Sequence, residues 1–335
     1  MTYVLGVDGG NSKTVAVIAR QDGTIIGAGR GGCTDIYGSF TGLPAELAES
    51  AALTALKDIL EATLRSAGVS AHDIVAGGFS LAGADWPEDY SFLHAALRQL
   101  GYGGANVIVN DALGALRAGS PDGTGISVVC GTGAAIGARA ADGRFWHGSH
   151  WLDAMGGHVM ARSALKAVYR ADLGIDPPTS LTLRIMALLD LPGVESIVHV
   201  FSARLGSSGR DLGRITPIVL DEASSGDTAA LNIVHDHAAK LGEYALAVGR
   251  RVGLVDGAQT LVLAGGVFRH PSTVYSEAIT GRVREGLPEV DTIVSRSEPV
   301  AGATLLGLEA AGVPITGEII RRVCATLPDG EIFVA

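Results

Sequence analysis

The stretch "GVDGGNSKTVAVIA", residues 6–19, decides the fold, because its glycine loop is either a P-loop or the turn of a β-hairpin. A P-loop needs Gly directly before its Lys and a helix directly after it. Here Ser12 precedes Lys13, and the next run, 14–18, is apolar and rich in β-branched residues, which is typical of a strand. A turn at 21–23 leads into another apolar run. The loop therefore joins two antiparallel strands, where its N–H groups can still face an anion.

The composition favours a globular protein that binds a small ligand or a protein partner. The chain has 335 residues, and its 47% hydrophobic content suffices for two packed cores. It contains no apolar run of eighteen residues, and its first residues do not form the basic and then apolar segments of a signal peptide. We therefore expect a cytoplasmic protein without a membrane span. The net charge of −10 is unfavourable for binding nucleic acid. Three cysteines without CxxC spacing argue against a disulfide framework and a zinc site.

The first part of the chain alternates predicted strands and helices. After the hairpin, helical spacing over 43–67 ends at Gly68, a suitable helix C-cap. Buried strands are predicted at 74–79 and 105–109, on either side of a helix that opens at Trp86. The order is therefore three hairpin strands, helix, strand, helix and strand.

The same order begins again halfway along the chain. The segment 124–146, "TGISVVCGTGAAIGARAADGRFW", repeats strand, glycine loop, strand and turn with nearly the same spacing, and strands at 261–264 and 292–294 follow. A duplicated ββαβα domain is the economical account. It predicts two domains, 1–118 and 119–335, with the last helix free to pack back on the first domain.

Three glycine loops, "GVDGGNSKT", "VVCGTGA" and "LVLAGGVF", occur in this order along the chain. They resemble the first phosphate, second phosphate and adenosine motifs of the superfamily that contains actin, the heat-shock ATPases and the sugar kinases. The "DGG…SKT" start, "AGADWPEDY" and "LDEASSGDTAALNIV" are similar to the BadF-type ATPase family, which includes N-acetylglucosamine kinase. The resemblance implies an α/β fold of two duplicated RNase H-like (actin-like ATPase) domains with a nucleotide and sugar cleft between them.

The resemblance also implies that ATP and Mg²⁺ are bound. Asp8 would hold Mg²⁺, because hard cations prefer oxygen ligands, although an aspartate that bonds only its own turn would look the same in the sequence. A solvated surface side chain is an equal alternative for Lys13. The implied nucleotide-binding residues are Gly9, Gly10, Asn11, Ser12, Lys13, Thr14, Gly131, Thr132, Gly133, Gly265 and Gly266.

Asp111 is the candidate catalytic base, because in "VIVNDALGALRAG" it stands where a buried strand gives way to a helix and where the family carries its base. An ordinary N-cap aspartate would look identical. The segments that match the family's sugar-binding region contain Asp35, where an Asn is common, Ala135, which follows the second phosphate loop, and Asp153. Asp153 matches the family's Asp, whereas the departures at Asp35 and Ala135 leave the acceptor open.

The expected activity is transfer of the γ-phosphoryl group of ATP to an amino sugar, most simply O6 of N-acetylglucosamine. Glucosamine or a hexose is an alternative acceptor, and a non-kinase ATPase switch that drives a partner protein is an alternative function. The expected partner is a small sugar, without nucleic acid or membrane, and the resemblance is compatible with a homodimer.

Overall fold

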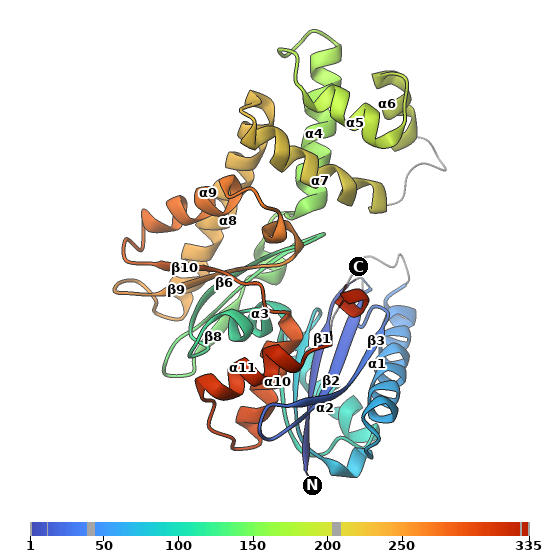
Figure 1. The fold of residues 1–335 in the computed structure, drawn as a ribbon, viewed down its shortest axis with the longest axis vertical. Helices are drawn as coiled ribbons and strands as arrows, with labels where there is room; N and C mark the ends of the chain where they lie inside the picture. The colour runs from blue at the N-terminus through green and yellow to red at the C-terminus, as the bar shows by residue number, and fades with distance from the viewer. Residues whose placement is uncertain (1, 12, 39–43, 203–208, 329, 334–335) are drawn as a thin grey trace. The chain divides into compact units, whose positions relative to one another are not determined.

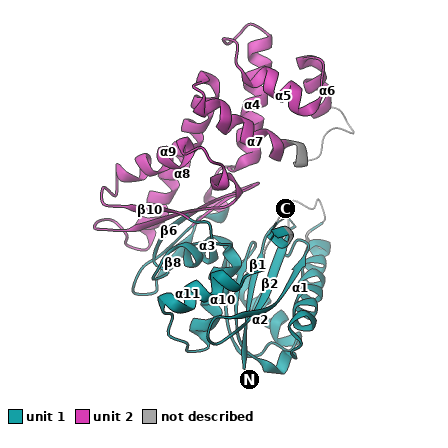
Figure 2. Cartoon of the chain, viewed as in Figure 1, with its two compact units in different colours: residues 1–127, 137–149, 295–335 teal, residues 128–136, 150–294 magenta. Residues whose placement is uncertain are grey.

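The computed structural model describes residues 2–11, 13–38, 44–202, 209–328 and 330–333. They form two compact units, each built from separate pieces of the chain (Figure 2). Unit 1 contains Met1–Ser127, Gly137–Ser149 and Ser295–Ala335, and unit 2 contains Val128–Ile136 and His150–Val294. The sequence-based limits at 1–118 and 119–335 stay a prediction.

The first sheet has the strand order β3-β2-β1-β4-β5 (Figure 1). Strands β1, β2 and β3 are antiparallel neighbours, whereas β1, β4 and β5 run parallel. The predicted hairpin is therefore confirmed. The strands are β1 (Tyr3–Gly9), β2 (Thr14–Arg20), β3 (Ile25–Gly31), β4 (Ile74–Leu81) and β5 (Ala105–Asn110).

The second sheet has the order β10-β9-β6-β7-β8, with β7 and β8 antiparallel and β9 and β10 parallel. When β6 to β10 are aligned with β1 to β5, the two sheets have the same strand order, so the duplicated architecture is confirmed. The strands are β6 (Gly125–Cys130), β7 (Ala134–Arg139), β8 (Phe145–His147), β9 (Thr260–Ala264) and β10 (Asp291–Val294).

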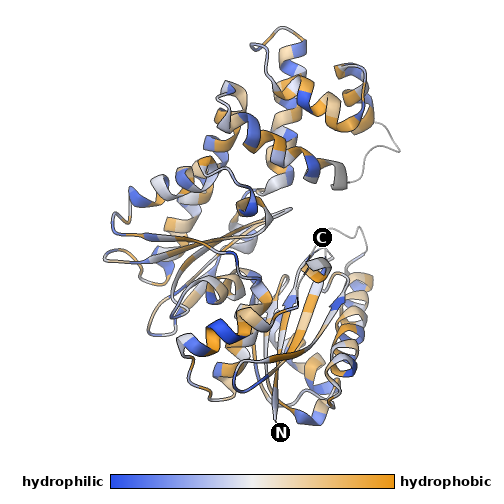
Figure 3. Ribbon diagram, in the orientation of Figure 1, coloured by the Kyte–Doolittle hydropathy of each residue, from blue (hydrophilic) through white to orange (hydrophobic). Residues whose placement is uncertain are grey.

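The core of unit 1 has helices on both faces of the first sheet. Successive strand residues point to opposite faces, so Leu5 packs in the cluster with Leu56 of α1, while Val4 packs in the cluster with Leu305 of α10. Figure 3 shows the hydrophobic residues along β1 and β2. The helices of unit 1 are α1 (Ala45–Ala67), α2 (Pro87–Gln99), α3 (Asp111–Gly119), α10 (Pro299–Ala310) and α11 (Gly317–Thr326). Gly68 caps α1 in the left-handed conformation, as predicted, and residue 43 lies outside the described residues.

Helix α10 approaches its neighbours so closely that side chains would not fit. A Cβ added at Gly302 would lie 1.9 Å from the carbonyl oxygen of Gly114 in α3, and one added at Gly78 of β4 would lie 1.9 Å from the carbonyl oxygen of Ala303. Glycine therefore permits backbone-to-backbone contact at both positions. This contact fixes α3, whose first residue is Asp111, against the sheet.

Unit 2 contains five helices between β8 and β9 and one between β9 and β10 in the described part of the chain. They are α4 (Gly157–Asp172), α5 (Leu181–Leu189), α6 (Val194–Ser202), α7 (Gly209–Ser224), α8 (Thr228–Arg251) and α9 (Val274–Arg284). Short 3₁₀ helices are η1 (Ala71–Asp73), η2 (Ser149–Trp151), η3 (Gly266–Arg269) and η4 (Gly330–Phe333). Among the described residues, no single helix is long and apolar enough to span a membrane, although the bent pair α5 and α6 passes this test by length and composition.

Candidate active site

The strands β1, β4 and β5 bring their polar ends to one edge of the first sheet. Asp8 pairs in register with Ser80 of β4, and Ser80 with Val109 of β5. Since neighbouring strands lie about 4.8 Å apart, the backbones of Asp8 and Val109 are separated by about 10 Å across this edge. Asp111 begins α3 two residues later, so its position in the fold is on the same edge as Asp8.

Asp8 lies in a partly buried position where a negative charge is unfavourable. Burial, followed by repulsion from Asp111 and Glu298, raises its pKa from 3.8 to about 7, although the ammonium of Lys13 acts in the opposite direction. A carboxylate with this environment gains by binding a cation, which would remove the repulsion. The chemistry of Asp8 therefore fits a divalent metal ion better than a bond within its own turn.

Asp111 is also partly buried among other carboxylates. Burial, and then the charges of Asp85 and Asp35, raise its pKa from 3.8 to about 6, while the backbone N–H of Ala112 lowers it. A general base is most effective when its pKa lies near the working pH. The environment of Asp111 therefore suits proton abstraction better than an exposed carboxylate would.

Asp35 lies in a tightly held loop, and its side chain is 3% exposed. Its Oδ1 accepts a hydrogen bond of 3.0 Å from the backbone N–H of Tyr37, and a Cβ added at Gly83 would lie 2.6 Å from this oxygen. The Tyr37 hydroxyl donates to the carboxylate of Asp89 at the start of α2, at 2.9 and 3.0 Å from its two oxygens. Asp35 thus supports its loop. Its role in sugar binding stays a prediction.

Asp85, in the loop after β4, is a further residue of this edge that the sequence motifs do not predict. Its Oδ1 accepts a hydrogen bond of 2.9 Å from Nδ2 of Asn110, and the Nδ1 of His147 lies 3.7 Å from the same oxygen. The available signal was its place in the loop between a predicted buried strand and the helix that opens at Trp86. Ligands of open α/β sheets bind outside the carboxyl ends of their strands.

The hairpin loop between β1 and β2 contains one unsatisfied polar atom. The Oδ1 of Asn11 is buried without a hydrogen-bond partner among the described residues. Gly10 donates its N–H to the carbonyl of Lys13 at 2.9 Å, which closes the turn. An unpaired buried acceptor near Asp8 fits a site that takes a metal ion or its water ligands.

The other residues expected at this loop are placed differently. The hydroxyl of Thr14 is buried and donates to the carbonyl of Gly32 at 2.8 Å, so it serves the protein interior. The ammonium of Lys13 donates to the carbonyl of Phe333 near the end of the chain. A phosphate contact from either side chain stays a prediction, and Ser12 lies outside the described residues.

Unit 2 holds the second glycine loop between the N-terminus of α4 and the loop after β9. Gly157 donates its N–H to the carbonyl of Gly131 at 2.8 Å, and His158 donates to that of Thr132 at 3.2 Å. A Cβ added at Gly156, whose φ is +114°, would lie 2.5 Å from Cα of Gly133. Only glycine fits there.

The adenosine motif contacts the same loop. A Cβ added at Gly265, whose φ is +103°, would lie 2.5 Å from the carbonyl oxygen of Cys130, directly before the loop. Cβ atoms added at Gly131 and Gly266 would meet no atom within 4 Å. The two predicted motifs are therefore brought together, and their backbones border open space that a ligand could approach.

A buried hydrogen-bond chain lies behind this loop. The N–H of Gly156 donates to Nε2 of His237 at 2.9 Å, the Nδ1 of His237 lies 2.8 Å from the hydroxyl of Tyr275, and this hydroxyl donates to Sγ of Cys130 at 3.4 Å. Burial lowers the pKa of His237 to about 4, so its imidazole is neutral and can accept from Gly156. The chain thereby links Gly156, at the N-terminus of α4, to Cys130, which directly precedes the second glycine loop.

The remaining predicted sugar-binding residues belong to unit 2. Ala135 lies near the start of β7, and Asp153 is exposed before α4 with its N–H donating to the Tyr244 hydroxyl at 3.2 Å. Asp35 and Asp111 belong to unit 1. Sugar binding by these four residues therefore stays a prediction. Among the described residues, no group of three or more His, Cys, Asp or Glu side chains is arranged to hold a metal ion by itself.

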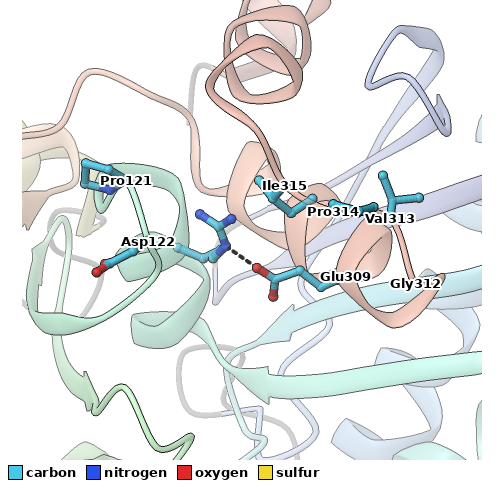
Figure 4. A pocket seen from close by; sticks show the side chains of 8 residues that line it. Pro121, Asp122, Glu309, Gly312, Val313, Pro314 and Ile315 are labelled. Carbon is cyan, nitrogen blue, oxygen red and sulfur yellow. Dashed lines mark hydrogen bonds and ion pairs between the residues drawn. The ribbon is translucent and has the colours of Figure 1, made fainter.

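A surface pocket of about 530 Å³ in unit 1 contains none of the predicted site residues (Figure 4). Pro121 and Asp122 lie on one side and Gly312–Ile315 on the other, with Glu309 between them. The Nε of buried Arg117 donates to Glu309 at 2.9 Å, and both residues of this ion pair line the pocket. The pocket joins the ends of α3 and α10 and has a structural ion pair where a ligand would need open polar groups.

Comparison with known proteins agrees with this arrangement. The N-acetylmuramic acid/N-acetylglucosamine kinase of Clostridium acetobutylicum is 27% identical over 310 residues, which are 91% of this chain and 98% of the relative. The glucosamine kinase GspK of Vibrio cholerae is 25% identical over 272 residues, 80% of this chain and 85% of the relative. A solved structure from Chromobacterium violaceum, provisionally described as an N-acetylglucosamine kinase, has a TM-score of 0.64 at 22% identity and covers 91% of this chain and 99% of its own.

The structural likeness confirms the fold that the glycine motifs predicted. The family model for the BadF/BadG/BcrA/BcrD ATPases matches residues 5–307, which include every predicted site residue. The chain therefore belongs to the BadF/BadG/BcrA/BcrD ATPase family.

Proposed function

We propose that this protein is an ATP-dependent carbohydrate kinase that phosphorylates an amino sugar on a hydroxyl, O6 in the first instance. The environment of Asp111 carries this proposal, since a carboxylate with its pKa raised to about 6 stands at the start of α3 on the polar edge of the first sheet. The similarity to curated sugar kinases over most of the chain supports the same enzyme class.

Asp111 would act on the acceptor hydroxyl. Its carboxylate takes the hydroxyl proton while the hydroxyl oxygen forms a bond to the γ-phosphorus and the bond from that phosphorus to the ADP oxygen breaks. ADP leaves with the electron pair of the broken bond. Phosphoryl transfer of this kind depends mostly on positioning and charge neutralisation.

The first glycine loop would take the phosphate end of ATP. Gly9 and Gly10 would offer backbone N–H groups, and Asp8 would hold Mg²⁺, with Oδ1 of Asn11 available to a water ligand of the ion. Bound Mg²⁺ neutralises phosphate charge. The second glycine loop would also offer backbone N–H groups to the phosphates, and the Gly265–Gly266 turn would contact the adenosine.

N-acetylglucosamine is the first candidate acceptor, and glucosamine is the second. The relative from Clostridium acetobutylicum, which by its name acts on N-acetylmuramic acid and N-acetylglucosamine, supports the first, and the relative from Vibrio cholerae, which by its name acts on glucosamine, supports the second. Glucosamine is favoured by one observation, namely that the carboxylates of Asp35 and Asp85 raise the pKa of Asp111 and would attract an ammonium group.

An ADP-release assay over glucosamine, N-acetylglucosamine, N-acetylmuramic acid and glucose tests the proposal. We expect sugar-dependent release with at least one amino sugar and a phosphate on O6 in the product's ³¹P-coupled NMR spectrum. ADP release that no sugar stimulates, but that a partner protein does, would instead indicate an ATPase switch. Asp111→Ala serves as the control for contaminating kinases, since it should abolish the sugar-dependent part.

A further inference from the structure

The side chain of Asn110 is saturated by hydrogen bonds within unit 1. It is 2% exposed, and its Nδ2 donates both to Oδ1 of Asp85 at 2.9 Å and to Oγ of Ser149 at 3.0 Å. Its Oδ1 accepts from the backbone N–H of Ala112 at 3.1 Å. A primary amide has two N–H donors, and both are used here. Asn110 therefore has no donor to offer to a sugar.

These bonds exceed what a helix cap requires. An N-cap needs only an oxygen that accepts from the first turn, and aspartate does this as well as asparagine. The two donated bonds, by contrast, need the amide group. They join three segments: the loop after β4 through Asp85, the junction of β5 and α3 through Asn110, and η2 through Ser149. We call these three residues the amide bracket.

The amide bracket is itself supported on its outer side. The Oγ of Ser149 lies 3.0 Å from Nδ1 of His147, and the hydroxyl of Tyr90 in α2 lies 3.4 Å from Nε2 of the same ring. The polar groups behind Asp111 thus form a continuous network from α2 to β8. A network of this kind restrains the backbone at its centre, where Asn110 precedes Asp111.

On the basis of the proposed kinase function, we propose that Asn110 is a positioning residue, whose amide bracket holds the carboxylate of Asp111 in line with the acceptor hydroxyl, and that it is not a sugar ligand. Asp111 follows directly in the chain, so the capped first turn of α3 sets its backbone. Misplacing a reacting group by about 1 Å can cost about 100-fold in rate. The bracket therefore affects turnover more than substrate affinity.

Asn110→Asp is the sharpest test because it retains the capping oxygen. It replaces the shared donor by an oxygen that faces the carboxylate of Asp85, so the bracket breaks by repulsion while the cap persists. We expect kcat to fall about 100-fold, with KM for ATP and for the sugar changed by less than about threefold. Asp85→Asn alone retains an acceptor oxygen for Asn110 and should lose less activity.

The exchanged pair Asn110→Asp/Asp85→Asn provides the rescue. The two side chains again provide one donor and one acceptor, and the hydrogen bond between positions 85 and 110 now runs in the opposite direction. The Ser149 hydroxyl can rotate to donate to the carboxylate at position 110. We therefore expect kcat to return to within about tenfold of the wild type. Thr316→Ala, which removes the N-cap of α11, controls for the loss of a cap elsewhere. It should lower the melting temperature and leave kcat unchanged.

Three results would overturn the inference: Asn110→Asp with more than about a third of the wild-type kcat, no rescue by the exchanged pair, or a raised sugar KM with an unchanged kcat. All variants are assayed at a temperature where unfolding curves show them folded. If the wild type shows no sugar-dependent turnover, the kinase proposal fails instead. Hydrogen exchange of residues 111–116 then tests the bracket alone: Asn110→Asp should speed exchange and the exchanged pair should slow it again, and unchanged exchange would refute it.

Discussion

Replacing Asp8 by asparagine should make the nucleotide-free protein more stable while it disables the enzyme. In the unfolded chain the carboxyl has a pKa near 3.8, whereas burial and the negative charges of Asp111 and Glu298 raise it to about 7 in the folded protein. The ionised form is therefore less favourable in the folded state than in the unfolded state. Asparagine has nearly the same shape and carries no charge.

The stability that Asp8→Asn adds should increase as the pH rises. Between pH 4 and 7 the folded protein binds a proton that the unfolded chain has released, so the stability of the wild type falls as the pH rises through this window. Each unit by which the pKa differs between the folded and unfolded states corresponds to about 1.4 kcal/mol in the free energy of unfolding. Asp8→Asn should thus add up to about 4 kcal/mol at pH 8 and about 2 kcal/mol at pH 5. Partial exposure of the side chain to water reduces both values.

Urea unfolding of the nucleotide-free protein in EDTA, at pH 5 and pH 8, measures this difference. Asp142→Asn is the matched control, because Asp142 is an exposed turn residue whose pKa is lowered by bonds from Arg144. It should show no gain at pH 8. A variant at Asp8 that is no more stable than the wild type at pH 8, or whose gain fails to grow between pH 5 and 8, would refute the reasoning. In the assay with ATP, the same variant should lose turnover that added Mg²⁺ restores only in part.

Asp111→Ala should lower kcat by about 100-fold or more with the KM for ATP nearly unchanged, and a variant with over a tenth of the wild-type kcat would contradict the role of base. The pKa of about 6 for Asp111 predicts that kcat/KM falls about tenfold for each pH unit below 6; a flat profile between pH 5 and 7 would argue against it. Asp35→Asn should raise the ratio of kcat/KM for N-acetylglucosamine over glucosamine by about tenfold. An equal loss of activity on both sugars would indicate that Asp35 only stabilises its loop, through the bond from the N–H of Tyr37. Gly302→Ala should destabilise the protein by about 1–3 kcal/mol or more, because its Cβ would clash with the backbone of Gly114. Gly281→Ala in α9, where an added Cβ would meet no atom within 4 Å, should stabilise the protein by up to about 1 kcal/mol. Equal denaturation midpoints for the two variants would refute the packing argument.

Patterns that depend on neighbouring residues were predictable from the sequence. The apolar runs that end at Asp8 and before Asp111 gave β1 and β5, and the glycine loops gave the duplication that the two sheets confirm. Local periodicity and turn chemistry determine these features, so no knowledge of distant contacts was needed.

Features that depend on distant contacts were not predictable. Asp85 resembles any polar residue before a helix, and only the fold places it against Asn110, which is 25 residues away. The inward direction of the Thr14 hydroxyl depends on Gly32, which lies directly after β3. The contact of Gly302 with Gly114 joins residues far apart in the sequence. Sequence spacing carries no signal for such pairs, because their distance is set by the packing of whole elements.

The three cysteines differ in their surroundings, and this makes the native chain suited to selective labelling. Cys130 is buried behind the second glycine loop, where its pKa rises to about 12, and Cys33 is partly buried with a raised pKa. Cys324 on α11 is exposed. Alkylating reagents attack thiolates that solvent can reach, so a maleimide dye at neutral pH should attach to Cys324 first. A fluorescent reporter can therefore be placed on unit 1 of the unmodified chain, with the thiol beside the second glycine loop left intact.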